Sequence, residues 1–193
     1  MNFSHANLCL RPKVCRYRKG MSIIMHHIII NTERLLLRPL SVSDASAVYE
    51  WASDERVTRY MNYPTYTSIQ QVREWLASAT KNSSTYHFGF ERFSDGRLIG
   101  SGDICPDNHT EYWRFGYNIR YDCWGNGYAT EAARAMMDYV RREFGVTHFR
   151  ASHAEPNLAS GKVIEKCGLK FIQYGNWQKL DGSCKMRSME YER

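Results

Sequence analysis

Two glycines one residue apart stand directly ahead of an alanine-rich segment in the stretch CWGNGYATEAARAMMDYV, residues 123–140. Glycine has no side chain and accepts a positive φ, so it allows a tight turn and a close approach of backbone N–H groups to a ligand. The helix predicted to follow adds the positive end of its dipole. Gly125 and Gly127 therefore indicate a site for an anion such as a diphosphate. The alternative is a strand-to-helix turn that binds nothing.

Two common nucleotide-binding motifs do not fit this stretch. A P-loop has Lys and then Ser or Thr directly after its last glycine, whereas Gly127 is followed by Tyr128 and Ala129. A dinucleotide fingerprint has a third glycine where Thr130 stands, and it follows the first strand of a βαβ unit. The glycine stretch here follows a later strand of a mixed pattern, so both nucleotide interpretations fail.

The elements that must position this stretch alternate between strand and helix patterns. Ser43 is predicted to cap the first helix, a second helix begins near Thr67 or Ser68, and Gly168 ends the last helix. Turns are predicted at residues 94–96 and 181–182. The predicted strands are 33–40, 84–93, 97–104, 111–120, 147–154, 169–177 and 183–192, and the predicted helices are 44–55, 68–80, 128–140 and 158–168. One α/β domain follows from this order.

Positive charge is concentrated at the start of the chain. Residues 1–20 contain five of the 26 basic residues and no acidic one, so the remaining 21 basic and 20 acidic residues nearly balance. We predict that residues 1–24 are a basic leader outside the fold and that residues 25–193 form the domain. A leader that touches RNA is the alternative, but the body lacks the like-charge block typical of specific nucleic-acid binding.

The cysteines favour a reduced, cytoplasmic protein without a metal site. They form no CxxC pair, they have no His partner at metal-binding spacing, and no secretory signal accompanies them. No apolar run approaches the length of a membrane-spanning helix, so we expect no membrane partner. The six cysteines are residues 9, 15, 105, 123, 167 and 184.

The glycine stretch and a second segment together resemble a known family. DCWGNGYATEAARAMMDYV, followed by EPNLASGKVIEKCGLKFIQYG, is similar to the GNAT superfamily of acyl-CoA-dependent N-acetyltransferases, and more narrowly to the branch of ribosomal-protein N-terminal acetyltransferases. The resemblance runs from about Thr32 to Glu192. It implies acetyl-CoA as the cofactor and a mixed, mostly antiparallel sheet of about seven strands flanked by about four helices, with a splayed strand pair holding the cofactor.

In that family, the segment Q/R-x-x-G-x-G/A binds the coenzyme A pyrophosphate through backbone amides. Asp122 stands at the Q/R position, which leaves the amides as the main anion ligands. The strand before the loop is implied to bind the pantetheine arm through its backbone, and a plain central strand is the alternative. The cofactor-binding residues implied are Tyr117, Asn118, Ile119, Cys123, Trp124, Gly125, Asn126, Gly127, Tyr128, Ala129 and Thr130, together with Asn157 and Ser160.

Acetyl transfer requires a proton acceptor for the amine, a donor for the oxyanion and a proton donor for the leaving thiolate. Relatives often place a Tyr acid seven residues after the motif Asn, but this chain has Ile164 there. We predict Ser160 as the acid and expect Asn157 to bind the pantetheine arm or the amine, with helix capping as the alternative for both. Glu155 is the predicted base through a water relay. The other polar candidates are Glu111, Asp103 and His153, and Arg114 replaces a Glu that this branch often carries.

An aromatic connection, residues 59–66, and Trp177 are expected to line the acceptor cleft, with core or lid packing as the alternative. The acceptor candidates are Tyr60, Met61, Tyr63 and Trp177. We predict a monomer or homodimer that transfers acetyl to a primary amine by direct attack in a ternary complex. A protein N-terminal α-amine of the ribosomal-protein type is preferred. A small-molecule amine acetyltransferase and a non-catalytic acyl-CoA sensor are the alternatives.

Overall fold

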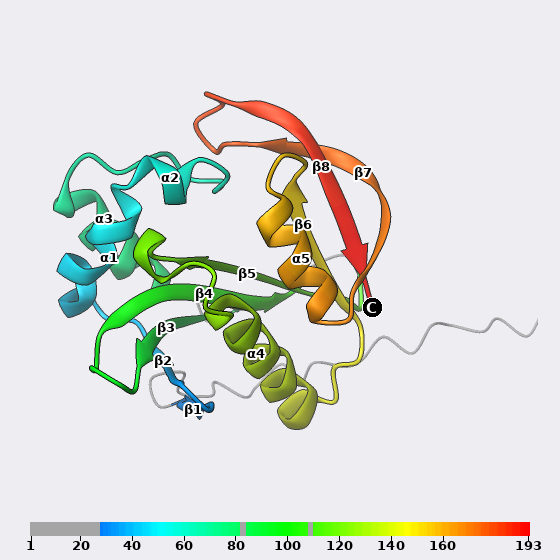
Figure 1. Cartoon of the computed structure of the whole chain (residues 1–193), viewed down its shortest axis with the longest axis horizontal. Coiled ribbons are helices and arrows are strands. Elements are labelled where there is room, and N and C mark those ends of the chain that lie inside the picture. The colour runs from blue at the N-terminus through cyan, green and yellow to red at the C-terminus, as the bar shows by residue number, and fades with distance from the viewer. Residues whose placement is uncertain (1–27, 82–83, 108–109) are drawn as a thin grey trace, which may run out of the picture.

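The computed structural model describes residues 28–81, 84–107 and 110–193. The predicted leader, residues 1–24, lies outside the described residues. The described part forms one sheet with helices packed on both faces (Figure 1). In sheet order, the strands are β1 (Ile30–Asn31), β2 (Leu35–Pro39), β3 (Tyr86–Arg92), β4 (Leu98–Pro106), β5 (Trp113–Ile119), β6 (Phe149–Ala154), β8 (Lys185–Glu192) and β7 (Lys170–Gln178).

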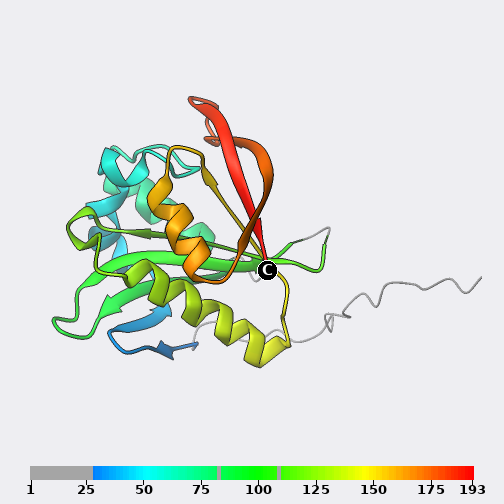
Figure 2. The ribbon, with the colours of Figure 1, turned by 45° about the vertical axis from the view of Figure 1, so that its right-hand side comes forward.

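The helices divide between two hydrophobic clusters. Buried residues of α1 and α3 pack with Leu40 and Leu98, whereas those of α4 and α5 pack against the opposite side of the sheet. Helix α4 runs along the sheet in both ribbon views, with α5 beside it (Figure 2). The α-helices are α1 (Ala45–Ala52), α2 (Glu55–Thr58), α3 (Ile69–Ala79), α4 (Tyr128–Phe144) and α5 (Leu158–Lys166).

The mixed, mostly antiparallel sheet confirms the expected fold, and the described residues add one short strand and one short helix to the elements expected. The predicted helix 44–55 is interrupted, because Asp54 accepts a hydrogen bond from the backbone N–H of Arg56 (2.9 Å) and starts the separate helix α2. Ser43 is not the cap of the first helix. A 3₁₀ turn precedes α1, and Ser41 stands at its N-cap, where its N–H donates to Asp44 (2.8 Å).

Local signals elsewhere are confirmed. The side chain of Ser68 caps α3 by accepting from the N–H of Gln71 (3.4 Å). Gly96, Gly168 and Gly182 all have positive φ, at 66°, 86° and 72°, in the turns where glycine is expected.

The sheet opens between its two parallel strands. Strand β5 pairs with β4 along its whole length, from Trp113 to Ile119, but it pairs with β6 only through Trp113 with Phe149 and Arg114 with Arg150. Beyond Arg114 the two strands separate, which confirms the expected splayed pair. The edge of β5 that faces β6 therefore has backbone groups without a strand partner.

Candidate active site

The glycine loop joins β5 to α4 in the conformation that the two glycines allow. Gly125 has φ 78° and Gly127 has φ 81°, and both are exposed. Gly127 is the N-cap of α4 and has no side chain to offer, so no capping side chain accepts from the N–H groups of the first turn. Such N–H groups, together with the helix dipole, favour an anion. The side-chain amide of Asn126 instead donates to the carbonyls of Cys123 (3.2 Å) and Trp124 (3.0 Å), which stiffens the loop.

A cation outside the loop supports it. The Arg34 side chain, from the β1–β2 connection, donates to the carbonyl of Asn126 (2.9 Å) and pairs with Glu131 in the first turn of α4. The hydroxyl of Thr32 also donates to Glu131 (2.6 Å). Nothing in the sequence pattern singles out Arg34, because 92 residues separate it from Asn126.

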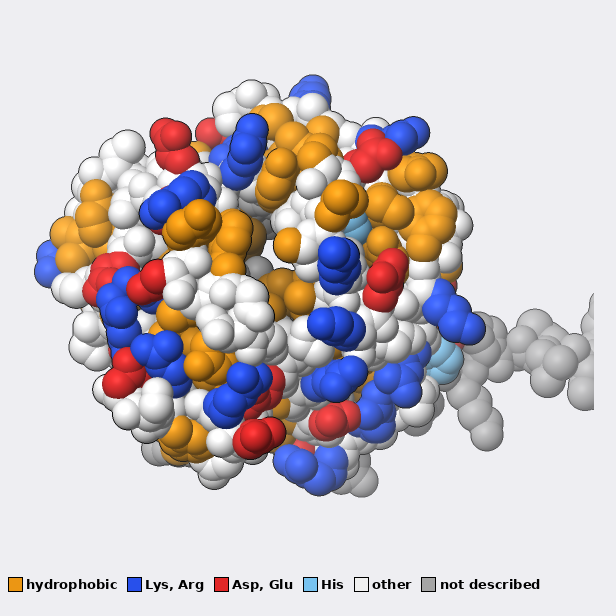
Figure 3. All heavy atoms as spheres, in the orientation of Figure 1, with side chains coloured by type: hydrophobic (Ala, Val, Ile, Leu, Met, Phe, Trp, Pro, Cys, Tyr) orange, Lys and Arg blue, Asp and Glu red, His pale blue; other side chains and the backbone are white. Residues whose placement is uncertain are grey.

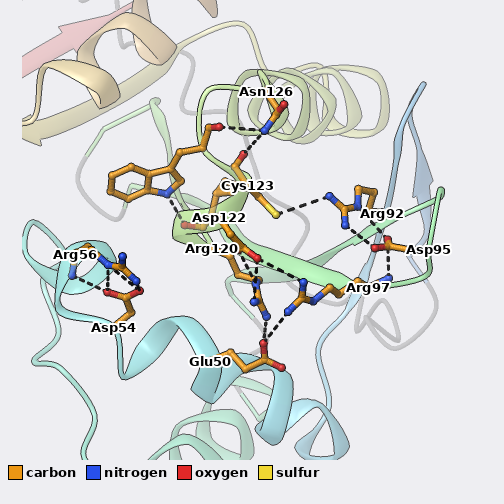
Figure 4. A network of polar contacts seen from close by, with 12 residues as sticks. Glu50, Asp54, Arg56, Arg92, Asp95, Arg97, Arg120, Asp122, Cys123 and Asn126 are labelled. Carbon is orange, nitrogen blue, oxygen red and sulfur yellow. Dashed lines mark hydrogen bonds and ion pairs between the residues drawn. The ribbon is translucent and has the colours of Figure 1, made fainter.

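Asp122 belongs to an ion network beneath the loop (Figure 4). Arg120 donates from Nε to Asp122 (3.0 Å) and also pairs with Glu50 of α1, while Arg97, directly before β4, lies 3.4 Å from Asp122 and 3.2 Å from Glu50. The hydrogen bond from Arg120 lowers the pKa of the Asp122 carboxyl below its usual range. The acid at the family's Gln/Arg position thus ties the loop to α1 and offers no positive charge to it.

The three predicted residues of β5 differ in their surroundings. The carbonyl of Ile119 accepts a hydrogen bond from the Trp124 indole (2.7 Å), so that group is already used. Asn118 lies on the α1 side of the sheet, where its side chain accepts from the Ser101 hydroxyl (3.2 Å). Tyr117 projects to the opposite face, toward α5.

Helix α5 brings two predicted catalytic residues to the open end of β5. Asn157 is its N-cap, and its side-chain oxygen accepts from the N–H of Ser160 (3.3 Å). The Ser160 hydroxyl lies 2.9 Å from the hydroxyl of Tyr117, which also donates to the Ser160 carbonyl (3.2 Å). Burial raises the pKa of Tyr117, and the contact with Ser160 only partly offsets this. The Tyr117 side chain, on a strand for which only a backbone role was implied, therefore touches the predicted acid. Ile164 is buried in the core.

The candidate bases are dispersed. Glu155 follows β6 and pairs with Arg187 of β8 through Arg187 Nε (2.8 Å), and this hydrogen bond lowers the pKa of the Glu155 carboxyl. Both ring nitrogens of the buried His153 are occupied, by the Ala154 carbonyl (2.9 Å) and the Tyr191 hydroxyl (3.2 Å). Glu111 is exposed ahead of β5. His153 is thus a packing residue, and Glu155 is held ionised.

Asp103 differs from these candidates because it makes no hydrogen bond to any residue that the structure describes. It lies on β4 between His87 of β3 and Gly116 of β5, and a Cβ at Gly116 would be 3.1 Å from Asp103 Oδ1. Asp103 is half-buried, so part of its surface stays accessible. Burial raises the pKa of the Asp103 carboxyl, and the charges of His87 and Arg114 oppose this shift. Burial also lowers the pKa of His87.

The expected aromatic wall stands over the same face of the sheet. Tyr63 and Trp75 line a narrow cavity together with Ser101 and Asn118. The other candidates, Tyr60, Met61 and Trp177, are half-buried. Figure 3 shows a hollow near the middle of the molecular face, between the elements around α2 and those around α5, with hydrophobic side chains at its rim.

The β7–β8 hairpin bridges this hollow on one side. The N–H of Leu180 donates to the carbonyl of Asn62 (2.7 Å), and the Lys179 ammonium donates to the carbonyl of Thr58 (3.2 Å). The aromatic connection and the hairpin that carries Trp177 therefore meet, as the acceptor prediction requires. Whether they contact an acceptor stays a prediction.

Within the described residues, no group of three or more His, Cys, Asp and Glu could hold a metal ion. No helix there is long and apolar enough to cross a membrane. The cysteines of this part, residues 105, 123, 167 and 184, carry no disulfide.

A splayed strand pair leaves a sheet edge for an extended ligand, and a glycine turn at the start of a helix suits an anion. The two features together are typical of a class of proteins that bind an extended ligand with an anionic end. Residues 34–170 match the acetyltransferase (GNAT) domain family. The chain belongs to this family, and it is an acetyl-CoA-dependent N-acetyltransferase of the GNAT type.

Individual relatives align with most of this chain. The uncharacterized N-acetyltransferase p20 of Bacillus licheniformis is 29% identical over 160 residues, which cover 78% of this chain and 88% of the relative. The FsC-acetyl coenzyme A-N(2)-transacetylase of Aspergillus fumigatus is 27% identical over 156 residues, covering 75% and 66% of the two chains. RimL, a ribosomal L7/L12 α-N-protein acetyltransferase solved with coenzyme A, superposes with a TM-score of 0.75 at 16% identity, covering 86% of this chain and 97% of RimL, which shows a common fold.

Proposed function

We propose that the protein transfers the acetyl group of acetyl-CoA to a protein N-terminal α-amine, of the ribosomal-protein type, by direct attack in a ternary complex. The observation that carries this proposal is the hollow between the aromatic connection and the β7–β8 hairpin, which opens beside the splay of β5 and β6. A chain end can enter such a hollow, and its apolar wall suits the first side chain of a peptide better than it suits a polycation.

The residues of the glycine loop fit the cofactor. The two positive-φ glycines and the uncapped first turn of α4 present backbone N–H groups, and no atom lies within 4 Å of the place where a Cβ of Gly125 would stand. We assign the diphosphate to the amides of residues 123–129, with the Thr130 hydroxyl beside them. The unpaired edge of β5 between Phe115 and Asn118 is the place for the amide-bearing pantetheine arm, by addition of a strand-like ligand to a sheet edge.

Acetyl-CoA supplies an activated acetyl thioester when bound. The residues of this chain then orient the amine, exclude water and transfer protons. Ser160 lies in the first turn of α5, beside the splay, and is the proposed proton donor to the departing sulfur. Tyr117, within hydrogen-bond distance of it, orients its hydroxyl. Asn157 positions Ser160 by capping the helix.

Glu155, predicted from its place at a strand end that could line the cleft, stays the proposed proton acceptor. Its pairing with Arg187 lowers its pKa, which weakens it as a base. A proton would reach Glu155 only through water, and an acceptor amine that is already neutral would need no such relay.

The name of the A. fumigatus relative specifies N(2), a numbered nitrogen atom, as the position that is acetylated. This relation supports a small-molecule amine as the second candidate acceptor. One experiment separates the candidates. The purified protein is incubated with acetyl-CoA and either a protein extract or a small-amine library, and the acetylated products are identified by mass spectrometry while released thiol is measured. Acetylated protein N-termini support the proposal, and acetylated small amines alone contradict it. Acetyl-CoA binding without thiol release in either mixture identifies a sensor.

A further inference from the structure

Asp103 occupies a position that neither the family resemblance nor the proposed catalytic residues explain. Its register partners are His87 on β3 and Gly116 on β5. Strand side chains two residues apart share a face, so Asp103 and Gly116 lie on the same face as Ser101 and Asn118, which line the aromatic cavity. The Asp103 side chain thus lies on the sheet face that carries this cavity, one register step beyond the residues that line it.

The direction of the carboxylate is fixed by Gly116. Because Oδ1 lies 3.1 Å from where a Cβ of Gly116 would be, the carboxylate leans over β5 above the one position without a side chain. Gly116 lies two residues past Arg114, the last residue of β5 that pairs with β6, so it stands where the strands begin to separate. Tyr117, the next residue, reaches Ser160 on the other face. The carboxylate and the proposed acid therefore approach the splay from opposite sides.

A half-buried carboxylate without a hydrogen bond to the protein is free to bind a ligand or a counter-ion. No hydrogen bond of the Asp103 carboxylate to any described residue occurs, although part of its surface remains accessible. The charged and titratable groups that face it are His87 from β3, Arg114 from β5 and Cys105 on its own strand. The nearest aromatic neighbour of His87 is Trp75 of α3, whose ring centroid is 6.2 Å away in an edge-on arrangement.

We propose that Asp103 is the binding site for the acceptor's primary ammonium group and accepts its first proton. This inference rests on the proposed function and specifies the site within it. An ammonium group offers three N–H donors and a positive charge, which complement a carboxylate on the sheet face that carries the aromatic cavity. His87 positions the carboxylate from the adjacent strand.

The proton balance is complete. The ammonium loses one proton to Asp103, and the lone pair of the neutral amine forms the C–N bond as the C–S bond breaks. Nitrogen loses its second proton to water, while Ser160 passes a proton to sulfur and regains one from solvent. Asp103 returns its proton to solvent when the product leaves, so one proton is released in each cycle.

Asp103→Asn tests the inference with little change of shape. The probe is a short peptide with a free N-terminal alanine, titrated calorimetrically into the protein saturated with a non-reactive thioether analogue of acetyl-CoA. At pH 7 we expect at least tenfold weaker peptide binding and at least tenfold lower kcat/KM, with unchanged affinity for the analogue and unchanged Tm. Gly116→Ala, which displaces the carboxylate, should act in the same direction. Glu143→Gln, at an exposed glutamate near the end of α4, is the matched control.

The pH profile separates an ammonium site from a merely structural carboxyl. Peptide α-amines have pKa values of about 7.7–8.0, so above about pH 8 the amine arrives neutral and the Asn variant should recover much of its lost kcat/KM. A structural defect would not recover with the amine's ionisation. Peptide binding and turnover of Asp103→Asn within twofold of the wild type would overturn the inference, as would a wild type that binds no peptide. A wild type that binds the peptide through Asp103 but never releases thiol would leave the ammonium site standing and reject the proposed function.

Discussion

The hydroxyls of Tyr117 and Ser160 lie 2.9 Å apart, although 43 residues separate them and they come from β5 and α5. The contact crosses the place where β5 and β6 splay, so it links the two sides of the proposed thioester site. Relatives often carry a Tyr acid on the last helix, and the buried Ile164 stands there in this chain. Here a tyrosine from the strand reaches the helix instead.

Ser160→Ala should lower kcat at least tenfold, about 1.4 kcal/mol of barrier, with little change in acetyl-CoA affinity, because the thiolate would lose its proton donor. Tyr117→Phe should lower kcat less than Ser160→Ala does. The double variant should have the same kcat as Ser160→Ala, since the effects of residues that act as one unit are not additive. Steady-state thiol release and calorimetric binding measure both effects. Ser152→Ala, at an exposed serine on β6, is the control. A loss of kcat below tenfold would show that Ser160 is only a residue of the first helical turn and not the acid.

Gly125→Ala should weaken acetyl-CoA binding at least fivefold, because the new methyl group enters the proposed anion cradle and the positive φ disfavours it. Gly145, at the other end of α4, is an ideal control because it too has a positive φ (68°) and no atom within 4 Å of an added Cβ. Both alanine variants should lose about 1–2 kcal/mol of stability. Calorimetry and thermal unfolding compare them. Equal acetyl-CoA affinity in the two variants would make the loop an ordinary turn.

Arg120→Ala should loosen the glycine loop, because it leaves Glu50 and Asp122 facing each other with only Arg97 between them. The side chain of Arg120 is only 12% exposed, whereas its partners Glu50 (47%) and Asp122 (52%) are about half exposed, so solvent screens these ion pairs in part. We expect a loss of about 1 kcal/mol in unfolding free energy and weaker acetyl-CoA binding. Denaturant unfolding checks the first effect. Arg142→Ala, in an exposed pair with Glu143, should stay within about 0.5 kcal/mol of the wild type. A similar loss in both variants would contradict a special role for the network.

Features set by a few neighbouring residues were predictable. The Ser68 cap, the Gly168 helix end and the positive φ of Gly125 and Gly127 all depend on local backbone chemistry. The break in the predicted helix 44–55 was missed. The hydrophobic pattern continues through Asp54, but the Asp54 side chain caps a new helix there.

The site was predictable only in part, because its remaining contacts depend on strand register and on helix placement. Asp103 is one of several acids in the sequence, and only the pairing of β4 with β5 places it over Gly116. The contact of Arg34 with Asn126 likewise follows from the position of α4 relative to β2. Strand alternation places Tyr117 opposite Asn118, but nothing local shows that α5 brings Ser160 to meet it.

Asp44→Asn should reveal a carboxylate that stabilises the fold in a defined pH range. Burial alone would raise the pKa of Asp44, but hydrogen bonds from Arg38 (2.9 and 3.0 Å) and from the N–H of Ser41 outweigh it, so the folded pKa lies below the usual 3.8. The folded state therefore binds this proton less readily than the unfolded state. The stabilisation is full above about pH 5 and is lost as the pH falls through the folded pKa. Urea unfolding at pH 7 and pH 3 should show a difference between wild type and variant that shrinks at the lower pH. An undiminished difference at pH 3 would assign the effect of the substitution to lost packing rather than to the charge.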